Sequence, residues 1–258
     1  MHASPSFDLS DERPEATLAQ QGFALLGSKR SLAVCGIDAT SLERLARTWE
    51  DLPADEYLRD GGHYRSRRHA SLILSDDATQ VLETVRRAHW QSTDYNALHG
   101  GIERWFAPIE GETLGEPAML GLITGIGMLF TRCAGHPLRF VEVHQFRIDT
   151  EGGIGRPTPE GAHRDGVDFV AVVLIARQSV RGGETRVFQA SSPSGLRFTM
   201  IEPGSALLLD DCRVIHETTP VQPDGTPGHR DTLVLTYRNA GFQNPEYHDG
   251  LRQTPLIR

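Results

Sequence analysis

The sequence lacks the features that mark several common classes of protein. It has three cysteines, Cys35, Cys133 and Cys212, which lie far apart and form no CxxC pair, so neither a zinc knuckle nor a disulfide framework is indicated. Acidic residues outnumber basic ones by 34 to 26, and a net charge of −8 does not favour binding to nucleic acid or to an anionic membrane. Residues 1–11 have no apolar stretch, so we expect no signal peptide and predict a cytoplasmic protein with reduced thiols.

Long hydrophobic runs are also missing. The most apolar stretch, residues 118–130, is interrupted by three glycines and is too short to span a bilayer, so it predicts a buried helix and no membrane partner. The composition, 38% hydrophobic and 23% charged, is that of an ordinary globular chain and excludes a wholly disordered or fibrous protein. A length of 258 residues fits a single mixed domain.

The N-terminal half carries the spacing of helices. Apolar residues recur at three and four positions over residues 42–49, and Thr40 with Glu43 fits a capping box at the start of that helix. The same spacing predicts a second helix over residues 77–90 and a third over residues 117–133. We expect these helices to support the second half of the chain.

From residue 137 onward, short apolar segments alternate with Gly and Pro turns, which is typical of β-strands. So many strands predict a barrel or sandwich, including the jelly-roll type, and hence one α+β domain. We place a flexible N-terminus at 1–16, a single domain at 17–240 and a C-terminal tail at 241–258. Within the domain we expect helical support over 17–136 and the β core over 137–240, with strands at 138–149, 168–176, 185–189, 196–201, 205–209, 214–219 and 232–238.

Two histidines and an aspartate have the pattern of a metal site. His163 and Asp165 are two residues apart, so in an extended segment both side chains point to the same side. His216 follows a strand-like run about 50 residues later, a separation that suits a strand returning beside the first. Two imidazoles and one carboxylate form the facial triad of non-haem Fe(II) oxygenases. The neighbouring Asp210 and Asp211 are expected in a turn around these ligands.

A candidate anion site follows the last histidine. Arg230 lies 14 residues after His216 at the start of the last apolar strand, where a guanidinium can bind the distal carboxylate of a dicarboxylate by two parallel hydrogen bonds. Thr232 is two residues further on and shares its face, so its hydroxyl could add a contact.

At this point the sequence resembles a known family. His163, Asp165, His216 and Arg230 in this order resemble the iron(II)- and 2-oxoglutarate-dependent dioxygenases. The longer strings are similar to a bacterial subfamily that contains free L-amino-acid hydroxylases, such as the L-isoleucine dioxygenases, and a member linked to biofilm and stress responses. These strings are residues 143–148, 160–169, 181–184 and 230–233, within a resemblance that covers roughly 55–240.

The resemblance implies a double-stranded β-helix, a jelly-roll barrel with helices packed on one side. It implies that His163, Asp165 and His216 bind Fe(II) and are the catalytic centre. It implies 2-oxoglutarate as co-substrate, bound to the iron and to Arg230, and O₂ as oxidant. The expected reaction is hydroxylation of a small polar substrate, most simply a free L-amino acid, with release of succinate and CO₂.

Three further residues are candidates for substrate binding. Gln145 and Arg147 share one face of the strand 138–149, and His144 and Phe146 share the other, so one pair must point into the barrel. An inward Arg147 could hold a substrate carboxylate, and a structural ion pair is the alternative. Tyr64 lies in the arginine-rich segment 57–69, which is either a lid that meets an anionic substrate or a solvated loop or salt-bridge cluster.

Two other functions stay open on the residues alone. The same chemistry could act on a peptide or protein side chain, and a barrel of this kind could bind a metal or ligand for sensing without turnover. The intact triad and Arg230 favour an enzyme with a small-molecule substrate. The sequence is compatible with a homo-oligomer.

Overall fold

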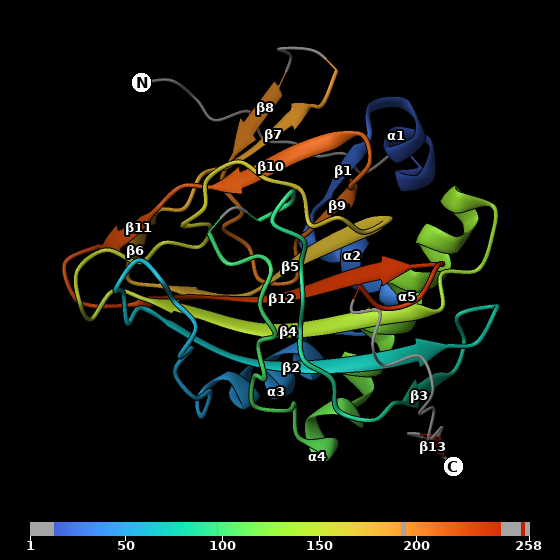
Figure 1. Cartoon of the computed structure of the whole chain (residues 1–258), viewed down its shortest axis with the longest axis horizontal. Coiled ribbons are helices and arrows are strands. Elements are labelled where there is room, and N and C mark those ends of the chain that lie inside the picture. Colours follow the sequence, from blue (N-terminus) through green and yellow to red (C-terminus); the bar gives the residue numbers. More distant parts are fainter. Residues whose placement is uncertain (1–12, 97, 192–194, 244–253, 256–258) are drawn as a thin grey trace.

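A large antiparallel sheet forms the centre of the computed structural model, which describes residues 13–96, 98–191, 195–243 and 254–255 (Figure 1). In sheet order its strands are β1 (Phe23–Leu26), β9 (Ala206–Asp210), β5 (Phe169–Gln178), β12 (His229–Arg238), β4 (Phe140–Asp149), β2 (Arg65–Leu74), β3 (Val81–Glu83) and β13 (Thr254–Pro255). Two smaller sheets are β10 (Val214–Thr218), β7 (Thr185–Gln189) and β8 (Gly195–Phe198), and β11 (Val221–Pro223) with β6 (Val180–Gly182).

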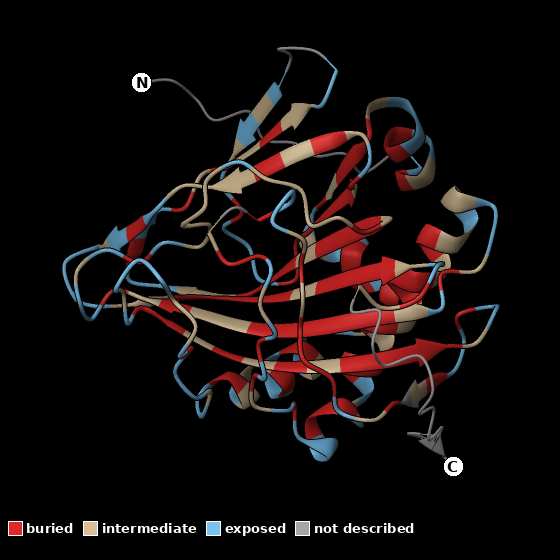
Figure 2. Cartoon of the chain, viewed as in Figure 1, coloured by how far each residue is buried: buried red, intermediate tan, exposed pale blue. Residues whose placement is uncertain are grey.

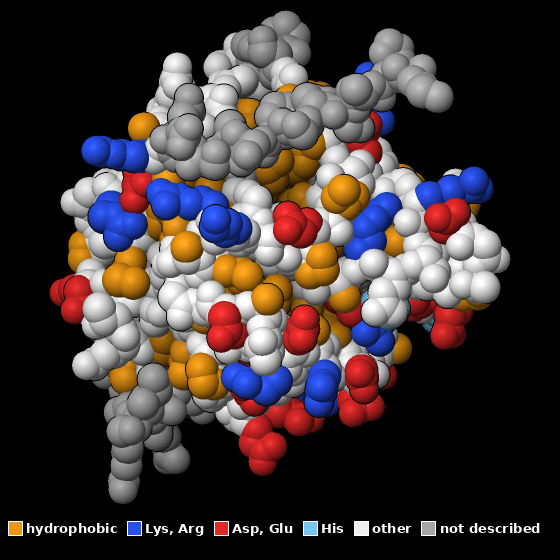
Figure 3. Space-filling view, turned by 180° about the vertical axis from the view of Figure 1, so that it is seen from behind, with side chains coloured by type: hydrophobic (Ala, Val, Ile, Leu, Met, Phe, Trp, Pro, Cys, Tyr) orange, Lys and Arg blue, Asp and Glu red, His pale blue; other side chains and the backbone are white. Residues whose placement is uncertain are grey.

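Helices cover one face of the large sheet (Figure 1). They are α1 (Pro14–Gln21), α2 (Ser28–Cys35), α3 (Ala39–Ala46), a 3₁₀ turn η1 (Arg47–Trp49), α4 (Gly111–Leu114) and α5 (Pro117–Ala134). The apolar side chains of α3 and α5 share one core cluster with those of β2, β4, β5 and β12. Figure 2 shows the same distribution, with the middle of the sheet buried and the connecting loops exposed. On the face opposite to that of Figure 1, acidic and basic side chains are interspersed with hydrophobic ones (Figure 3).

Side-chain alternation divides the central strands between two environments. On β4, Val141 and Val143 belong to the helix-covered core, whereas His144 and Phe146 face the other side of the sheet and line a pocket. On β12, Leu233, Leu235 and Tyr237 pack in the same core. Because successive side chains of a strand point to opposite faces, one strand can stabilise the core and supply polar groups to the pocket.

The helix α5 is the expected buried helix of residues 117–133. Pro117 occupies its first turn, and Gly135 ends it with a left-handed φ of 72°. Among the described helices it alone is long and apolar enough to cross a membrane by length and composition, and ten of its residues are buried in the core. Gly121 and Gly125 let its backbone approach α2, because a Cβ on Gly125 would lie 2.7 Å from Cys35 Cα.

Most of the expected strands are present within a few residues of their predicted ends, and β7 has the predicted ends, 185–189. The helix predicted over 77–90 is wrong. Asp77 there accepts hydrogen bonds from Ser75 and Thr79 in a tight turn, and Ala78 has a positive φ of 57°, which a helix cannot continue. The chain then pairs with β2 as β3.

Three other local predictions need correction. Helix α3 begins at Ala39, and Asp38 caps it by accepting a hydrogen bond from the backbone N–H of Ser41, in place of the expected capping box. Helix α1 begins at Pro14, inside the segment expected to be a flexible N-terminus, of which residues 1–12 lie outside the described part. Strand β2 was not expected, because its alternating Arg and His side chains obscured the strand pattern.

The close approach of α5 to α2 predicts the effect of a single methyl group. Gly125→Ala should lower the free energy of unfolding by about 1–3 kcal/mol, because the new Cβ meets backbone atoms that cannot move aside. Gly111→Ala in α4 is the matched control, since nothing lies within 4 Å of its added Cβ. Urea unfolding of both variants measures the difference, and equal stabilities would contradict the packing described.

Candidate active site

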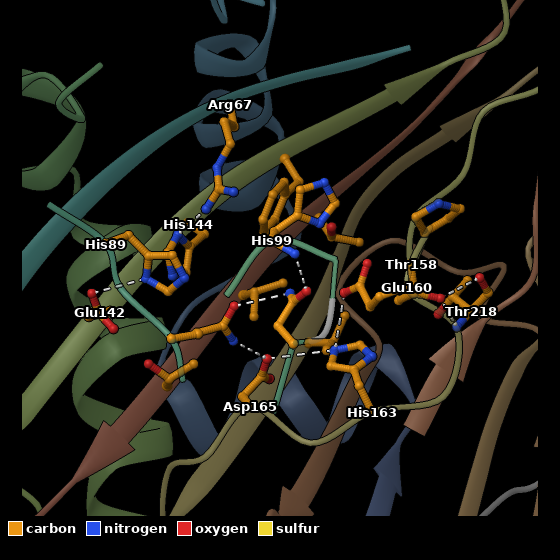
Figure 4. Close-up of a pocket in the computed structure, with 18 of the residues that line it drawn as sticks. Arg67, His89, His99, Glu142, His144, Thr158, Glu160, His163, Asp165 and Thr218 are labelled. Atoms are coloured by element: carbon orange, nitrogen blue, oxygen red, sulfur yellow. Dashed lines mark hydrogen bonds and ion pairs between the residues drawn. The ribbon is translucent and has the colours of Figure 1, made fainter. Parts of the chain in front are cut away.

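A polar pocket lies on the face of the large sheet that the helices leave open (Figure 4). It is lined by side chains of β2, β4, β5, β12 and β10, by the connecting segments 89–104 and 157–167, and by Gln243. The space that a water-sized molecule can enter is about 120 Å³. The segment between β3 and α4 crosses in front of the sheet and forms the outer wall (Figure 1). A pocket this small, with ionic groups of both signs, suits small polar molecules.

The three predicted metal ligands converge at one end of this pocket. His163 and His216 are held side by side by an antiparallel bridge, with backbone N–H···O distances of 3.0 and 2.9 Å. The Nε2 atom of His163 lies 3.6 Å from Asp165 Oδ1, and that of His216 lies 4.0 Å from Asp165 Oδ2. Two ligands of one ion can be up to about 4.4 Å apart, so these distances suit a shared metal. All three donor groups lie within 4.8 Å of one another.

The three donor groups of the triad differ in the direction in which their pKa values are shifted. Burial lowers the pKa of the His163 imidazole, but the hydrogen bond and charge of Asp165 outweigh it and raise the pKa to about 10. Burial, together with the neighbouring His163, lowers the pKa of His216 to about 4. Burial would raise the pKa of Asp165, whereas the two imidazoles hold it below its usual range. A divalent cation would replace the proton on His163.

Asp211 anchors the backbone of the loop that carries Asp165. Its fully buried carboxylate accepts hydrogen bonds from the backbone N–H groups of Asp165, Gly166 and Val167 at 3.0, 2.7 and 3.1 Å. Burial and the nearby charge of Asp165 raise the pKa of Asp211 to about 6, and the three amides act in the opposite direction. This aspartate therefore fixes the backbone from which Asp165 projects.

Arg230 is a buried cation in the pocket. It is 3% exposed, its Nε has no hydrogen-bond partner, and within the described part of the chain no carboxylate lies within ion-pair distance of it. The adjacent Asp231 points to the opposite face, where it binds Arg147. Thr232 shares the pocket face with Arg230, as its spacing predicts. An uncompensated buried guanidinium is costly unless a ligand carboxylate pairs with it.

The structure does not bring the other three predicted residues into the pocket. Arg147 forms a two-point ion pair with Asp231 at 2.8 and 2.7 Å, which is the alternative that the sequence left open. Gln145 donates to Thr48 Oγ1 on the helix-covered face. Tyr64 is buried in a small apolar cluster, and its hydroxyl donates to Asp60 at 2.5 Å. The inward face of β4 is that of His144 and Phe146, so we assign no substrate contact to these three residues.

Several pocket residues were not anticipated. Gln91 Nε2 donates to Asp165 Oδ1 at 3.1 Å, and Gln91 Oε1 accepts from Arg104 Nη2 at 2.9 Å and from Asn96 Nδ2 at 3.3 Å. Gln243, in the expected C-terminal tail, donates to the carbonyls of Asp165 and Gly166. Residues 91–104 follow the segment for which a helix was predicted, and no motif in the sequence links them to the triad.

A second buried group of possible metal ligands is His69, His89, Glu142 and His144, and all but His69 line the pocket. Glu142 accepts from His69 Nε2 at 3.1 Å and from His89 Nδ1 at 3.2 Å, and Figure 4 shows His89 and His144 next to this carboxylate. Burial would raise the pKa of Glu142, but the imidazoles hold it below its usual range. The ionised carboxylate can only accept, so both imidazole nitrogens carry hydrogens.

Hydrogen bonds account for this group without a metal ion. Arg67 Nη2 donates to His144 Nδ1 at 2.7 Å, and its guanidinium stacks over the rings of Phe106 and Phe146. A neutral imidazole that accepts on Nδ1 carries its proton on Nε2, which leaves no lone pair for a cation. The nearby positive charge of Arg67 also opposes one. The triad of His163, Asp165 and His216 is the better metal site.

Comparisons with known proteins agree with this geometry. The family model described as 2OG-Fe dioxygenase matches residues 46–236, and the chain belongs to this family. A bsmA homolog from Methylobium petroleophilum is 51% identical over 90% of this chain and 94% of its own, with a TM-score of 0.83. No curated protein matches the chain.

Two more distant structures show the same fold. IDO from Bacillus thuringiensis is 20% identical, covers 88% of this chain and 98% of its own, and has a TM-score of 0.69. A prolyl-4-hydroxylase from Pseudomonas putida is 15% identical with the same coverage and a TM-score of 0.51. The protein is therefore an oxidoreductase of the dioxygenase class, and its cofactors are Fe(II), 2-oxoglutarate and O₂. The converging imidazoles and the unpartnered Arg230 fit the first two of these groups.

The role of Asp211 predicts a loss of metal affinity. Asp211→Ala should weaken Mn(II) or Fe(II) binding by about 10- to 100-fold, because the backbone under Asp165 loses its anchor. It should also lower the free energy of unfolding by roughly 2–5 kcal/mol, because three amides lose their acceptor. Asp210→Ala is the adjacent control, since that carboxylate bonds only the turn at Cys212. Equal metal affinity in the two variants, measured by equilibrium dialysis, would be inconsistent with this role.

Proposed function

We propose that the protein hydroxylates a free L-amino acid, or a similar small polar metabolite, and releases succinate and CO₂. In this proposal His163, Asp165 and His216 hold the iron, and Arg230 with Thr232 binds the distal carboxylate of 2-oxoglutarate. We also infer that the sheet of β10, β7 and β8 and the large sheet are the two walls of the expected double-stranded β-helix. Family membership and the three free cysteines support a cytoplasmic enzyme.

The pocket residues have different roles in the proposed reaction. Bound iron supplies the oxidation, in which one atom of O₂ enters a C–H bond and the other enters succinate as CO₂ leaves. Arg230 and Thr232 orient 2-oxoglutarate by its far end. Asp211 and Gln91 keep the Asp165 carboxylate in place, one through the backbone and one through Oδ1. The buried position of these groups excludes water from the reacting centre.

One observation supports the choice of substrate: besides the triad, the pocket is lined by buried ionic groups of both signs. Oε1 of Glu160 lies 3.6 Å from His163 Nε2, and its buried Oε2 has no hydrogen-bond partner. Arg104 lines the same pocket without a carboxylate in ion-pair distance among the described residues. A free amino acid carries one cationic and one anionic group, which is the complement of this pair.

Succinate release tests the function. We expect turnover of 2-oxoglutarate with Fe(II) to rise on addition of one or more of the twenty L-amino acids, with a product 16 Da heavier by mass spectrometry. If only peptides stimulated succinate release, the substrate would be a polypeptide side chain. If the protein bound metal but released no succinate, it would be a sensor. His163→Ala should reduce turnover below about 1% of the wild-type rate while the protein stays folded. The exposed His136→Ala is its control.

Substitution of Arg230 should change the affinity for 2-oxoglutarate and not that for Fe(II). Arg230→Ala should weaken 2-oxoglutarate binding by on the order of 2–5 kcal/mol, because a buried carboxylate loses its charge-assisted pair. The Michaelis constant for 2-oxoglutarate measures this loss, and Fe(II) affinity should change little. Arg238→Ala, at the far end of the same strand, serves as the control. If only the Arg238 variant raised the requirement for 2-oxoglutarate, the co-substrate would have to bind at that end of β12.

A further inference from the structure

Two of the arginines that line the pocket form no ion pair with a described residue. Four arginines line it: Arg65, Arg67, Arg104 and Arg230. Arg65 and Arg67 share the buried carboxylate of Asp55, at 2.7 and 3.7 Å. Within the described residues, Arg104 and Arg230 have no carboxylate within 4.0 Å, although they are each 3% exposed. Once Arg230 binds the distal carboxylate of 2-oxoglutarate, Arg104 remains as a second buried cation.

The backbone and side chain of Arg104 are fixed in place. Its backbone N–H and C=O pair with those of His89 at 3.0 Å in both directions, which closes the segment 89–104 over the pocket. Its Nη2 donates to Gln91 Oε1, whereas its Nε is buried without a partner. Burial lowers the pKa of Arg104 to about 10, so the group is still charged at neutral pH. A fixed guanidinium with an unused donor is preorganised for an anion.

Arg104 is also close to the metal ligands. It reaches Asp165 through a single side chain, because Gln91 accepts from Arg104 at 2.9 Å and donates to Asp165 Oδ1 at 3.1 Å. With the bond lengths of the amide between them, Arg104 Nη2 is no more than about 8.6 Å from Asp165 Oδ1. An anionic group on Arg104 and a carbon next to the metal site are therefore close enough to belong to one small molecule.

We propose that Arg104 binds a carboxylate of the primary substrate, so that the enzyme oxidises a small carboxylic acid at a carbon only a few bonds from that group. The inference rests on the proposed function and narrows it, because a residue inside a polypeptide has no free α-carboxylate. Gln91 is a positioning residue in this arrangement, since it orients the guanidinium of Arg104 and the carboxylate of Asp165 together. Arg104 would bind only the carboxylate, and the ammonium group of an amino-acid substrate would need a different partner.

Binding to the non-reacting Mn(II) and 2-oxoglutarate complex tests the proposal. The probes are the twenty L-amino acids, their α-amides, and α-hydroxy acids such as lactate, with affinity measured by calorimetry and by the shift in melting temperature. We expect at least one free acid to bind the wild-type protein and its amide to bind about 30-fold more weakly or worse. This comparison needs no variant, so it does not depend on the folding of a mutant.

Variants then locate the carboxylate. Arg104→Gln should weaken the bound acid by about 30-fold or more and leave 2-oxoglutarate affinity within about twofold, and Arg104→Lys should restore part of the loss. The exposed Arg59→Gln should change neither affinity. The proposal is overturned if no carboxylic acid binds, if acids and amides bind equally, or if Arg104→Gln weakens 2-oxoglutarate in place of the acid. If hydroxy acids bind through Arg104 and amino acids do not, the carboxylate assignment stands and the amino-acid function fails.

Discussion

Compensation of buried charge is the constraint on which the rest of this structure depends. A charged group taken out of water costs several kcal/mol unless a partner or a ligand restores what it lost. Arg65 and Arg67 meet that cost with Asp55, and Glu142 meets it with two imidazoles. Arg230 and Arg104 have no such partner among the described residues, and both line the pocket that contains the triad. The paired groups compensate each other in the free protein, whereas the cost of burying these two cations is compensated only when anions bind.

The fold makes this concentration of charge tolerable by dividing each central strand. Strand β4 gives valines to the helix-covered core and a glutamate, a histidine and a phenylalanine to the pocket, and β12 does the same with leucines and Arg230. The apolar face, packed against α5, supplies the stability that the polar face lacks. Arg147 lies on the opposite face of β4 from the pocket. Its position in the strand puts its side chain on the helix-covered face, where the carboxylate of Asp231 compensates its charge and no ligand is needed.

The parts of the molecule that could be predicted are those with local signals. The continuous apolar run of β5 and the glycine-interrupted helix α5 follow from composition and period alone, and the order of His163, Asp165, His216 and Arg230 follows from motif spacing. Strand β2 could not be predicted in this way, because Arg65, Arg67 and His69 are polar at buried positions. The same difficulty applies to Gln91 and Arg104, whose roles come from the backbone pairing of His89 with Arg104, fifteen residues apart, and from partners distant in the sequence. The alternation of side chains along β4 predicts that the strand has two faces. Which face points into the pocket depends on how the helices pack against the sheet, and the sequence pattern does not reveal that.

The two unpaired cations also affect the stability of the free protein. An anion that binds only the folded pocket stabilises it, and each guanidinium compensated in this way removes a cost carried by the free protein. Asp165 lines the same pocket, and Gln91 is hydrogen-bonded to both Arg104 and Asp165. Arg104 is therefore connected to Asp165, the proposed metal ligand, through one amide. Because that amide uses its oxygen for the guanidinium and its nitrogen for the carboxylate, substrate recognition and metal geometry are parts of one hydrogen-bonded chain.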